Sequence, residues 1–197
     1  MIDFKVQLEN KWGGFSHPTH SDYEYNAPMH FISPNAKLNV LFSPKNEEDI
    51  HQLFLNHFDT DIPKDLMEFY KRYNGVRLFF GSLSVFGIQK FGEKDYQPYD
   101  LLMNNYNNRD CNRYDLVLVA TIGGQYVFGF KRNELTKIYG FKVREGEIVQ
   151  TFESFSDFFE HYFNCLFNEY DANAKKIHPN LNYKGIPCLE HLSYALM

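Results

Sequence analysis

The stretch from residue 62 to residue 88, IPKDLMEFYKRYNGVRLFFGSLSVFGI, decides how the fold of this chain is interpreted. Its first half repeats apolar residues at the i, i+3, i+4, i+7 spacing of one helical face, at Leu66, Phe69, Tyr70 and Tyr73. Pro63 suits the first turn of such a helix, and Asn74-Gly75 is expected to end it, because glycine accepts the left-handed conformation that satisfies the last carbonyls. The runs VRLFF and LSVFGI then flank Gly81-Ser82, which predicts a β-hairpin.

Two further amphipathic helices are predicted on either side of this stretch. In SPKNEEDIHQLFLNHF, residues 43–58, one helical face is formed by Ile50, Leu53, Phe54 and Phe58. Asn46 and Asp49 match an N-terminal capping pattern for that helix. In SFSDFFEHYFNCLFNEY, residues 154–170, Ser154 and Asp157 fit a capping box, and a Phe-rich apolar stripe continues for about three turns of roughly 3.6 residues each. A stripe of this kind predicts a helix that lies over a sheet.

The predicted strands come in consecutive hairpins. LVLVATI and QYVFGF flank Gly123-Gly124, a pair that can take both positive φ angles of a tight hairpin turn. KIYGFKV and EIVQTF flank residues 144–146 and give a third hairpin. With the hairpin in the opening stretch, the sequence predicts an antiparallel meander of about six strands packed by amphipathic helices, which is a single-domain α+β fold.

The order of these motifs resembles the SUKH superfamily of cell-wall assembly regulators and bacterial toxin-immunity proteins. The likeness rests on IPKDLMEFYKRYNG, on the Gly-Gly turn before QYVFGF and on the closing TFESFSDFFEHYF, and it covers residues 43–168. Residues 1–42 are interpreted as an N-terminal arm packed on that core, and residues 169–197 as a C-terminal tail. The matching positions are expected to be structural, namely Pro63, Asn74, Gly75, Gly123 and Gly124.

The resemblance implies a binding protein that is not an enzyme and needs no cofactor. Many bacterial members neutralise a cognate toxin, often a nuclease, inside the cell that makes it. The first hypothesis is therefore an immunity-type protein whose partner is a basic toxin domain. The alternative is a regulatory protein-interaction scaffold of the cell-wall assembly kind, and an enzyme is a third, less favoured class.

Composition agrees with a protein partner and disfavours nucleic acid. Acidic residues outnumber basic ones by 25 to 20, which gives a formal net charge of -5 and an isoelectric point near 5.9. Phosphate neutralisation needs a surplus of Lys and Arg, and no basic run is present. The three cysteines, Cys111, Cys165 and Cys188, show no CxxC spacing, so we expect reduced thiols and a cytoplasmic location. Charges near the N-terminus and the lack of an 18-residue apolar run argue against a signal peptide or a membrane span.

The segment around residues 92–115 is the best candidate for partner binding. Long connections with little structure are uncommon in compact domains and are often functional. Tyrosines supply amphipathic contact area here, and carboxylates complement a basic partner. The candidate residues are Glu93, Asp95, Tyr96, Tyr99, Asp100, Tyr106, Asp110 and Tyr114. A solvated loop whose tyrosines cover sheet edges explains the same pattern equally well.

Motifs for catalysis and metal binding are weak in this chain. GSLSVFG places Ser82 and Ser84 between glycines, but the flanking runs favour a hairpin over the strand-to-helix turn of a serine nucleophile. HPTHSD brings His17, His20 and Asp22 close in sequence, yet a polar surface loop is the favoured interpretation because no second ligand cluster follows at suitable spacing. No catalytic or metal-binding residue is therefore predicted.

Overall fold

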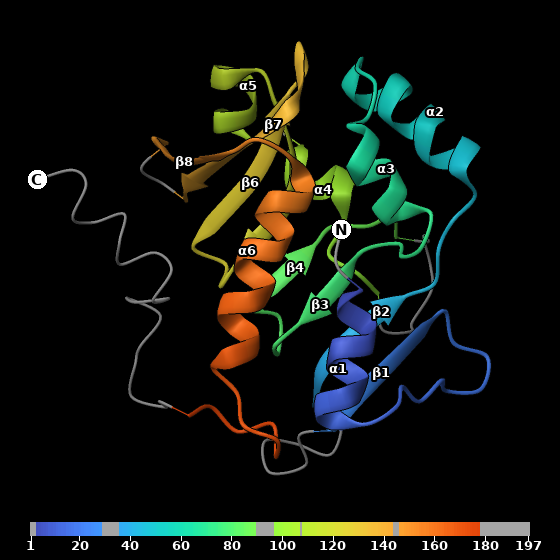
Figure 1. Ribbon diagram of the computed structural model, residues 1–197. Coiled ribbons are helices and arrows are strands. Elements are labelled where there is room, and N and C mark those ends of the chain that lie inside the picture. Colours follow the sequence, from blue (N-terminus) through green and yellow to red (C-terminus); the bar gives the residue numbers. More distant parts are fainter. Residues whose placement is uncertain (1–2, 29–35, 90–96, 107, 144–145, 178–197) are drawn as a thin grey trace, which may run out of the picture.

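An eight-stranded antiparallel sheet with the strand order β1-β2-β3-β4-β5-β6-β7-β8 forms the centre of the molecule (Figure 1). The computed structural model describes residues 3–28, 36–89, 97–106, 108–143 and 146–177. Each strand pairs with its neighbour in the sequence, so the sheet is a continuous meander. The α+β class that the sequence predicts is confirmed.

The strands and helices have the following bounds. The strands are β1 (Tyr23–Pro28), β2 (Lys37–Phe42), β3 (Val76–Leu78), β4 (Leu83–Val85), β5 (Leu116–Ile122), β6 (Tyr126–Lys131), β7 (Glu134–Lys142) and β8 (Ile148–Phe152). The helices are α1 (Phe4–Trp12), α2 (Glu47–Phe58), α3 (Lys64–Tyr70), α4 (Leu101–Asn105), α5 (Arg109–Tyr114) and α6 (Phe155–Asn168).

The expected strand count of six is wrong, because β1 and β2 extend the sheet. Both strands lie in residues 1–42, which the sequence suggested to be an arm. Each strand contains a buried asparagine, which interrupts the alternation of apolar and polar residues typical of a strand. The Nδ2 atom of Asn39 donates to the Oδ1 atom of Asn26 at 3.0 Å, and Asn26 donates to the Gly13 carbonyl at 3.0 Å. The backbone N–H of Phe79 donates to Asn39 Oδ1 at 3.1 Å. These polar groups are buried at no large cost because they satisfy one another.

Helices α2 and α6 begin where their capping residues predict. Asn46 accepts from the backbone N–H of Glu48 at the start of α2, and Ser154 accepts from the N–H of Asp157 at the start of α6. The apolar stripe of α6 is buried against the sheet, and Phe158 lies 4.6 Å from Phe128 between ring centroids. Each such aromatic side chain stabilises the fold by about 1.5–3 kcal/mol through burial.

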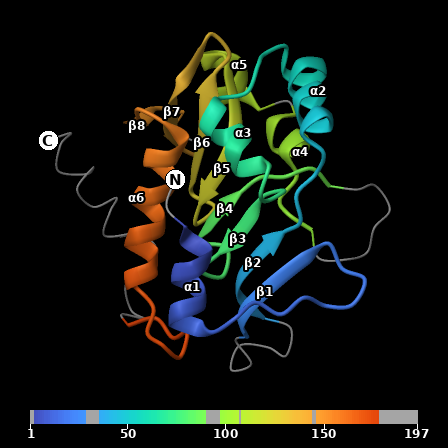
Figure 2. The same cartoon turned by 45° about the vertical axis from the view of Figure 1, so that its right-hand side comes forward.

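Helix α1 lies beside α6 on one face of the sheet (Figure 2). Phe4 packs against Phe159 at 5.0 Å between ring centroids. At the other end of α1, Lys11 Nζ donates to the Phe167 carbonyl at 2.6 Å, and Trp12 Nε1 donates to the Asp171 carbonyl at 2.8 Å. The N-terminal helix is therefore joined to the last helix by both apolar and polar contacts.

The Asn74-Gly75 junction does not end a helix as predicted. Helix α3 ends at Tyr70, and Lys71 is its C-cap. Instead, the side-chain amide of Asn74 pairs with the backbone of Ile88. Its Nδ2 atom donates to the Ile88 carbonyl, and its Oδ1 atom accepts from the Ile88 N–H, both at 2.8 Å. Gly75 has φ 84°, and a Cβ atom there would lie 2.7 Å from the Val85 carbonyl oxygen. The junction is a close backbone crossing that only glycine fits.

Two other structural predictions concern Pro63 and the Gly-Gly turn. Pro63 is the residue before the first turn of α3, at its N-cap, and is buried. Gly123 and Gly124 have φ angles of 56° and 66°. The N–H of Gln125 donates to the Ile122 carbonyl at 3.1 Å, which closes the turn between β5 and β6. The predicted pair of positive φ angles is thus confirmed.

Cys111 fits the expectation of reduced thiols and Cys165 does not, whereas Cys188 lies outside the described residues. Cys165, on α6, is disulfide-bonded, whereas Cys111, on α5, is buried and not part of a disulfide. The expectation is therefore wrong at Cys165.

Candidate partner-binding surface

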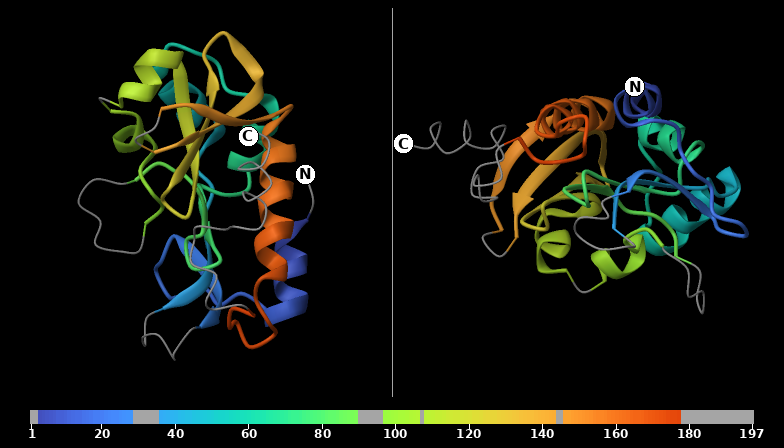
Figure 3. Two further views of the ribbon diagram at one scale, coloured as in Figure 1. Left: turned by 90° about the vertical axis from the view of Figure 1, so that its left-hand side faces the viewer. Right: turned by 90° about the horizontal axis from the view of Figure 1, so that it is seen from below.

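Helices α4 and α5 lie on the sheet face opposite to α1 and α6, as the view from below shows (Figure 3). Strand register defines this face. It aligns a row of residues that share one side of the pleat, namely Arg77, Ser84, Thr121, Val127 and Phe141. Because β5 is covered on both faces, all seven of its residues are buried. We call this second side of the sheet the α4 face.

Helix α4 is short and is fixed to the sheet by its buried side. The Asp100 carboxylate accepts from the Met103 N–H at 2.9 Å and so caps the helix. Leu101 is 1% exposed and belongs to the hydrophobic core. On the other side of the helix, Met103 is 70% exposed and Tyr106, its C-cap, is 74% exposed. These two large apolar side chains contribute little to the core.

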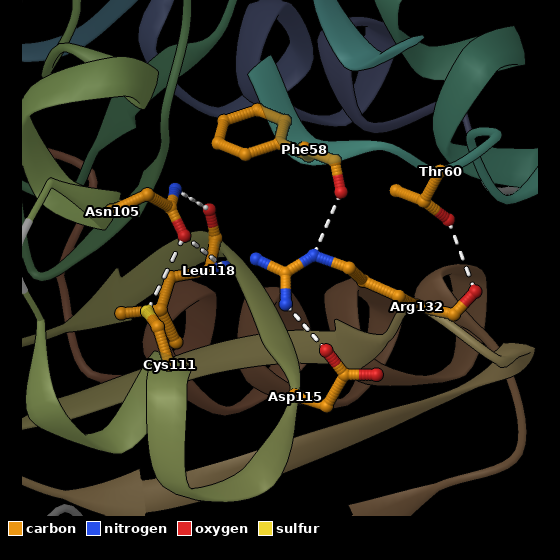
Figure 4. A network of polar contacts seen from close by, with 7 residues as sticks. All are labelled: Phe58, Thr60, Asn105, Cys111, Asp115, Leu118 and Arg132. Atoms are coloured by element: carbon orange, nitrogen blue, oxygen red, sulfur yellow. Dashed lines mark hydrogen bonds and ion pairs between the residues drawn. The ribbon is translucent and has the colours of Figure 1, made fainter. Parts of the chain in front are cut away.

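Asn105 holds α4 against the edge of β5 (Figure 4). Its Nδ2 atom donates to the carbonyls of Leu101 and Leu118, both at 2.8 Å. Its Oδ1 atom accepts from the Leu118 N–H at 2.7 Å, and Cys111 Sγ lies 3.5 Å from the same oxygen. One side chain thereby satisfies both backbone groups of Leu118, which is 1% exposed.

Arg132 joins three separate segments below this helix (Figure 4). Its Nε atom donates to the Phe58 carbonyl at 2.7 Å, at the end of α2. Its guanidinium pairs with the Asp115 carboxylate, and its backbone N–H donates to the Asp115 carbonyl at 3.0 Å. Thr60 Oγ1 donates to the Arg132 carbonyl at 3.0 Å. The turn between β6 and β7 therefore fixes the end of α2 next to the end of α5.

Tyr99 lies next to the sheet, with the Arg77 guanidinium over its ring. Its ring centroid is 4.7 Å from Arg77 Cζ, and Arg77 donates to its hydroxyl at 3.4 Å. The side chain remains 38% exposed. The cation–π contact orients the ring, so Tyr99 is a largely preformed part of the surface.

Tyr114 is used mainly by the fold. Its hydroxyl donates to the Gly146 carbonyl at 2.6 Å, and its ring packs 5.2 Å from Phe141. It covers a small apolar cluster of Leu116, Tyr139 and Phe141 on the α4 face. This is the role that the alternative interpretation gave to the tyrosines of the segment.

The other predicted contact residues have varied outcomes. Glu93, Asp95 and Tyr96 lie outside the described residues, and so does the side chain of Asp110. Tyr99, Asp100 and Tyr106 come together along α4 and the segment that leads into it. Met103, Asn105 and Arg132 were not predicted. An apolar residue on the polar side of a short helix was the only signal available for Met103.

A cavity of about 380 Å³ opens between α4 and the sheet. It is lined by Gly81, Phe86, Tyr99, Asn104, Asn108, Thr121, Gly124, Val127 and Val143. A smaller cavity of about 220 Å³ lies beside Tyr106 and Arg132, and another of about 440 Å³ lies between α3, β7 and the start of α6. We call the first of these the α4 pocket. It adjoins the exposed side chains just described.

Negative charge concentrates on a different part of the molecule. Residues 46–72, which contain α2 and α3, carry seven carboxylates and three basic side chains. This segment therefore holds most of the formal net charge of -5. Several of these groups are paired on the surface, as Glu47 and Glu68 are with Lys71, at 3.1 and 2.9 Å. Their combined field attracts cationic surfaces more than any single pair does.

The candidate catalytic and metal-binding motifs form no such site in the part of the chain that the structure describes. No group of three or more His, Cys, Asp and Glu side chains there could hold a metal ion, and this includes His17, His20 and Asp22. Ser82 is buried, and Ser84 Oγ donates to the Gly81 carbonyl at 3.2 Å within the hairpin turn. Among the described helices, none has the length and apolar character that crossing a membrane requires.

A meander sheet with helices on both faces defines a single-sheet α+β protein. The SMI1 / KNR4 family (SUKH-1) matches residues 44–161, and the chain belongs to this family. The family includes toxin-immunity proteins and cell-wall regulators. No curated protein matches the chain. The matched range contains the Asn74-Gly75 junction, α4 and the first half of α6, whereas α1, β1 and β2 lie before it.

Proposed function

We propose that this protein is an immunity protein that binds and neutralises a cognate toxin domain, without catalysis, in the cytoplasm of the cell that makes the toxin. The observation that carries the proposal is α4. Leu101 and Asn105 fix it to the sheet, and Met103 and Tyr106 stay 70% and 74% exposed. Methionine and tyrosine are enriched in interfaces, and two large apolar side chains without a role in the core favour a role in binding.

A basic nuclease domain is the partner class that the charge favours. Nucleases need a cationic surface to hold a phosphate backbone, and the carboxylates of residues 46–72 attract such a surface. Predicted contact residues Glu93 and Asp95 would add to the attraction. Electrostatic attraction of this kind raises the association rate, whereas close contacts at the α4 face set the dissociation rate.

The test uses the toxin domain encoded beside the gene for this protein. With a nuclease partner, one equivalent of the purified protein should abolish cleavage of DNA or RNA, and added salt should slow association. The double variant Met103→Ala/Tyr106→Ala should bind at least tenfold more weakly, which corresponds to about 1.4 kcal/mol. Because both side chains are exposed, its stability should change by less than about 0.5 kcal/mol.

The matched control is Val6→Ala/Leu55→Ala, which removes two exposed apolar side chains from α1 and α2. It should bind like the unmodified protein. If both double variants bind equally well, the α4 face is not the interface. If no neighbouring toxin is inhibited and the protein instead binds envelope or signalling proteins, the regulatory scaffold replaces the immunity function.

A further inference from the structure

The α4 pocket has an uncharged lining, and the Arg77 guanidinium lies against one of its lining residues, Tyr99. None of its nine lining residues carries a charge. Its lining includes Phe86, Tyr99, Val127 and Val143. Its volume of about 380 Å³ falls at the lower end of the range for small-ligand sites, roughly 300–1,000 Å³.

The walls of this pocket are largely preformed. Phe86 is 1% exposed, and its N–H donates to the Val119 carbonyl at 2.8 Å. Arg77 orients Tyr99 from the side, as described above. The turn that carries Gly124 is closed by its own hydrogen bond. A ligand would therefore lose little affinity in ordering the site.

Polar groups in the pocket are few and uncharged. Asn104 and Asn108 contribute side-chain amides from α4 and the residues after it, and Thr121 contributes a hydroxyl that donates to the Tyr126 carbonyl at 2.8 Å. Asn104 Nδ2 donates to the Asp100 carbonyl at 2.6 Å, and its amide oxygen can accept a hydrogen bond. The lining thus offers apolar contact area together with a small number of hydrogen-bond acceptors.

We propose that the α4 pocket receives an uncharged aromatic side chain with one polar hydrogen, as in tryptophan, from the protein partner. The proposal rests on the proposed function and names the chemistry of its central contact. A Lys or Arg side chain is disfavoured, because none of the lining residues offers a carboxylate to compensate its charge and the Arg77 guanidinium already lies against Tyr99. An aromatic ring fills the apolar volume, and its N–H or O–H group finds an acceptor at Asn104.

Two residues of the pocket also add apolar area to the surface. Tyr99 and Val143, each 38% exposed, belong to both the lining and the surface. Apolar area at the mouth of a pocket excludes water from a central anchor, which is the arrangement in which a single aromatic residue contributes most to binding.

The experiment is an NMR titration of the full-length protein with N-acetyl-L-tryptophanamide as the probe. Saturable shifts are expected at the amides of Thr121, Gly124 and Val143, with a dissociation constant on the order of millimolar. N-acetyl-L-argininamide should shift none of them saturably. The variants Val143→Glu and Asn104→Glu each place a carboxylate at the pocket and should weaken binding of the tryptophan probe at least tenfold. The control Val6→Glu makes the same change on α1 and should leave it unaltered.

Binding of the toxin domain by the same variants separates this proposal from the proposed function. A tenfold loss for both the probe and the toxin in Val143→Glu, but not in Val6→Glu, supports the aromatic anchor. Shifts that do not saturate, or that gather at Leu135 and Thr136 of the cavity near α3, overturn it. Toxin binding that is unchanged in both pocket variants also overturns it. If no toxin is bound, the proposed function fails, and the probe alone decides whether the pocket selects aromatic groups.

Discussion

Replacing Asn105 by alanine should destabilise the protein far more than replacing its neighbour Asn104. Asn105→Ala removes the hydrogen bonds to the Leu118 N–H and carbonyl, at 2.7 and 2.8 Å, and leaves two buried backbone groups without partners. An unsatisfied buried group costs about 1–3 kcal/mol. Because Asn105 itself is only partly buried, water will reach one side of the gap, and we expect a loss of about 2–4 kcal/mol in the free energy of unfolding.

Urea denaturation and hydrogen exchange measure this effect. For a chain of this size, each kcal/mol lowers the Tm by about 2–4 °C, so Asn105→Ala should lower it by roughly 5–15 °C. The Leu118 amide should exchange faster. In the control Asn104→Ala, only a hydrogen bond within α4 is lost, so the change should stay below about 0.5 kcal/mol. Equal stability of the two variants, or an unchanged exchange rate at Leu118, would refute the assigned role of Asn105.

Three further substitutions probe the fold. Gly75→Ala should lower the free energy of unfolding by about 2–4 kcal/mol, because the φ of Gly75 is 84° and the new Cβ would lie 2.7 Å from a backbone oxygen. The control Gly124→Ala, with φ 66° and no atom within 4 Å of the new Cβ, should lower it by about 1 kcal/mol. Equal losses in urea denaturation would contradict the close backbone contact at Gly75. Arg132→Lys should cost about 1–2 kcal/mol, since an ammonium cannot donate in the guanidinium geometry to both Phe58 and Asp115, and a neutral result in the same assay would remove this role. Burial lowers the pKa of His161 below its ordinary value of 6.5, so the unfolded chain binds a proton at this histidine at a higher pH than the folded protein does. The contribution of neutral His161 to the free energy of unfolding should therefore be fully present above pH 6.5 and decline as the pH falls below it. In His161→Phe this part of the decline should vanish, and an unchanged pH profile of Tm in that variant would contradict the prediction.

Elements with strong local signals could be predicted from the sequence. The capping residues Asn46 and Ser154 start α2 and α6 as expected, because each cap bonds an N–H group two or three residues away. The Gly123-Gly124 turn likewise depends only on the conformational freedom of its own residues. In each case the interaction lies within one or two helical turns, and sequence spacing therefore contains the necessary information.

Strands β1 and β2 could not be found in this way. Asn26 and Asn39 stand at positions that a simple alternation of apolar and polar residues assigns to solvent, yet they are 2% and 0% exposed. Their burial depends on each other and on backbone groups of α1 and of the segment after β3. Asn74 escaped correct interpretation for the same reason, since its partner Ile88 lies fourteen residues away.

For the candidate binding surface, the sequence predicted the segment of the chain but not which of its tyrosines are exposed. Tyr99 and Tyr106 were identified from composition and are exposed on the α4 face. Tyr114 was chosen by the same argument, but its ring and hydroxyl have partners within the fold. Residue type reveals that a tyrosine can serve an interface, whereas only the packing of β7 against α5 determines whether it is already used.

Unequal strand lengths explain why α4 lies where it does. Strand β4 has three residues and β5 has seven, so the first part of β5 extends beyond its neighbour and leaves backbone groups that need partners. Asn105 supplies them at Leu118, and Leu101 fills the core next to it. Leu101, which is buried, and Asn105, which is partly buried, therefore fix the helix, and they are distinct from the exposed Met103 and Tyr106. Because the side chains that hold the helix are distinct from the exposed pair, the exposed pair can be changed at little cost in stability, as an interface that adapts to different partners would require.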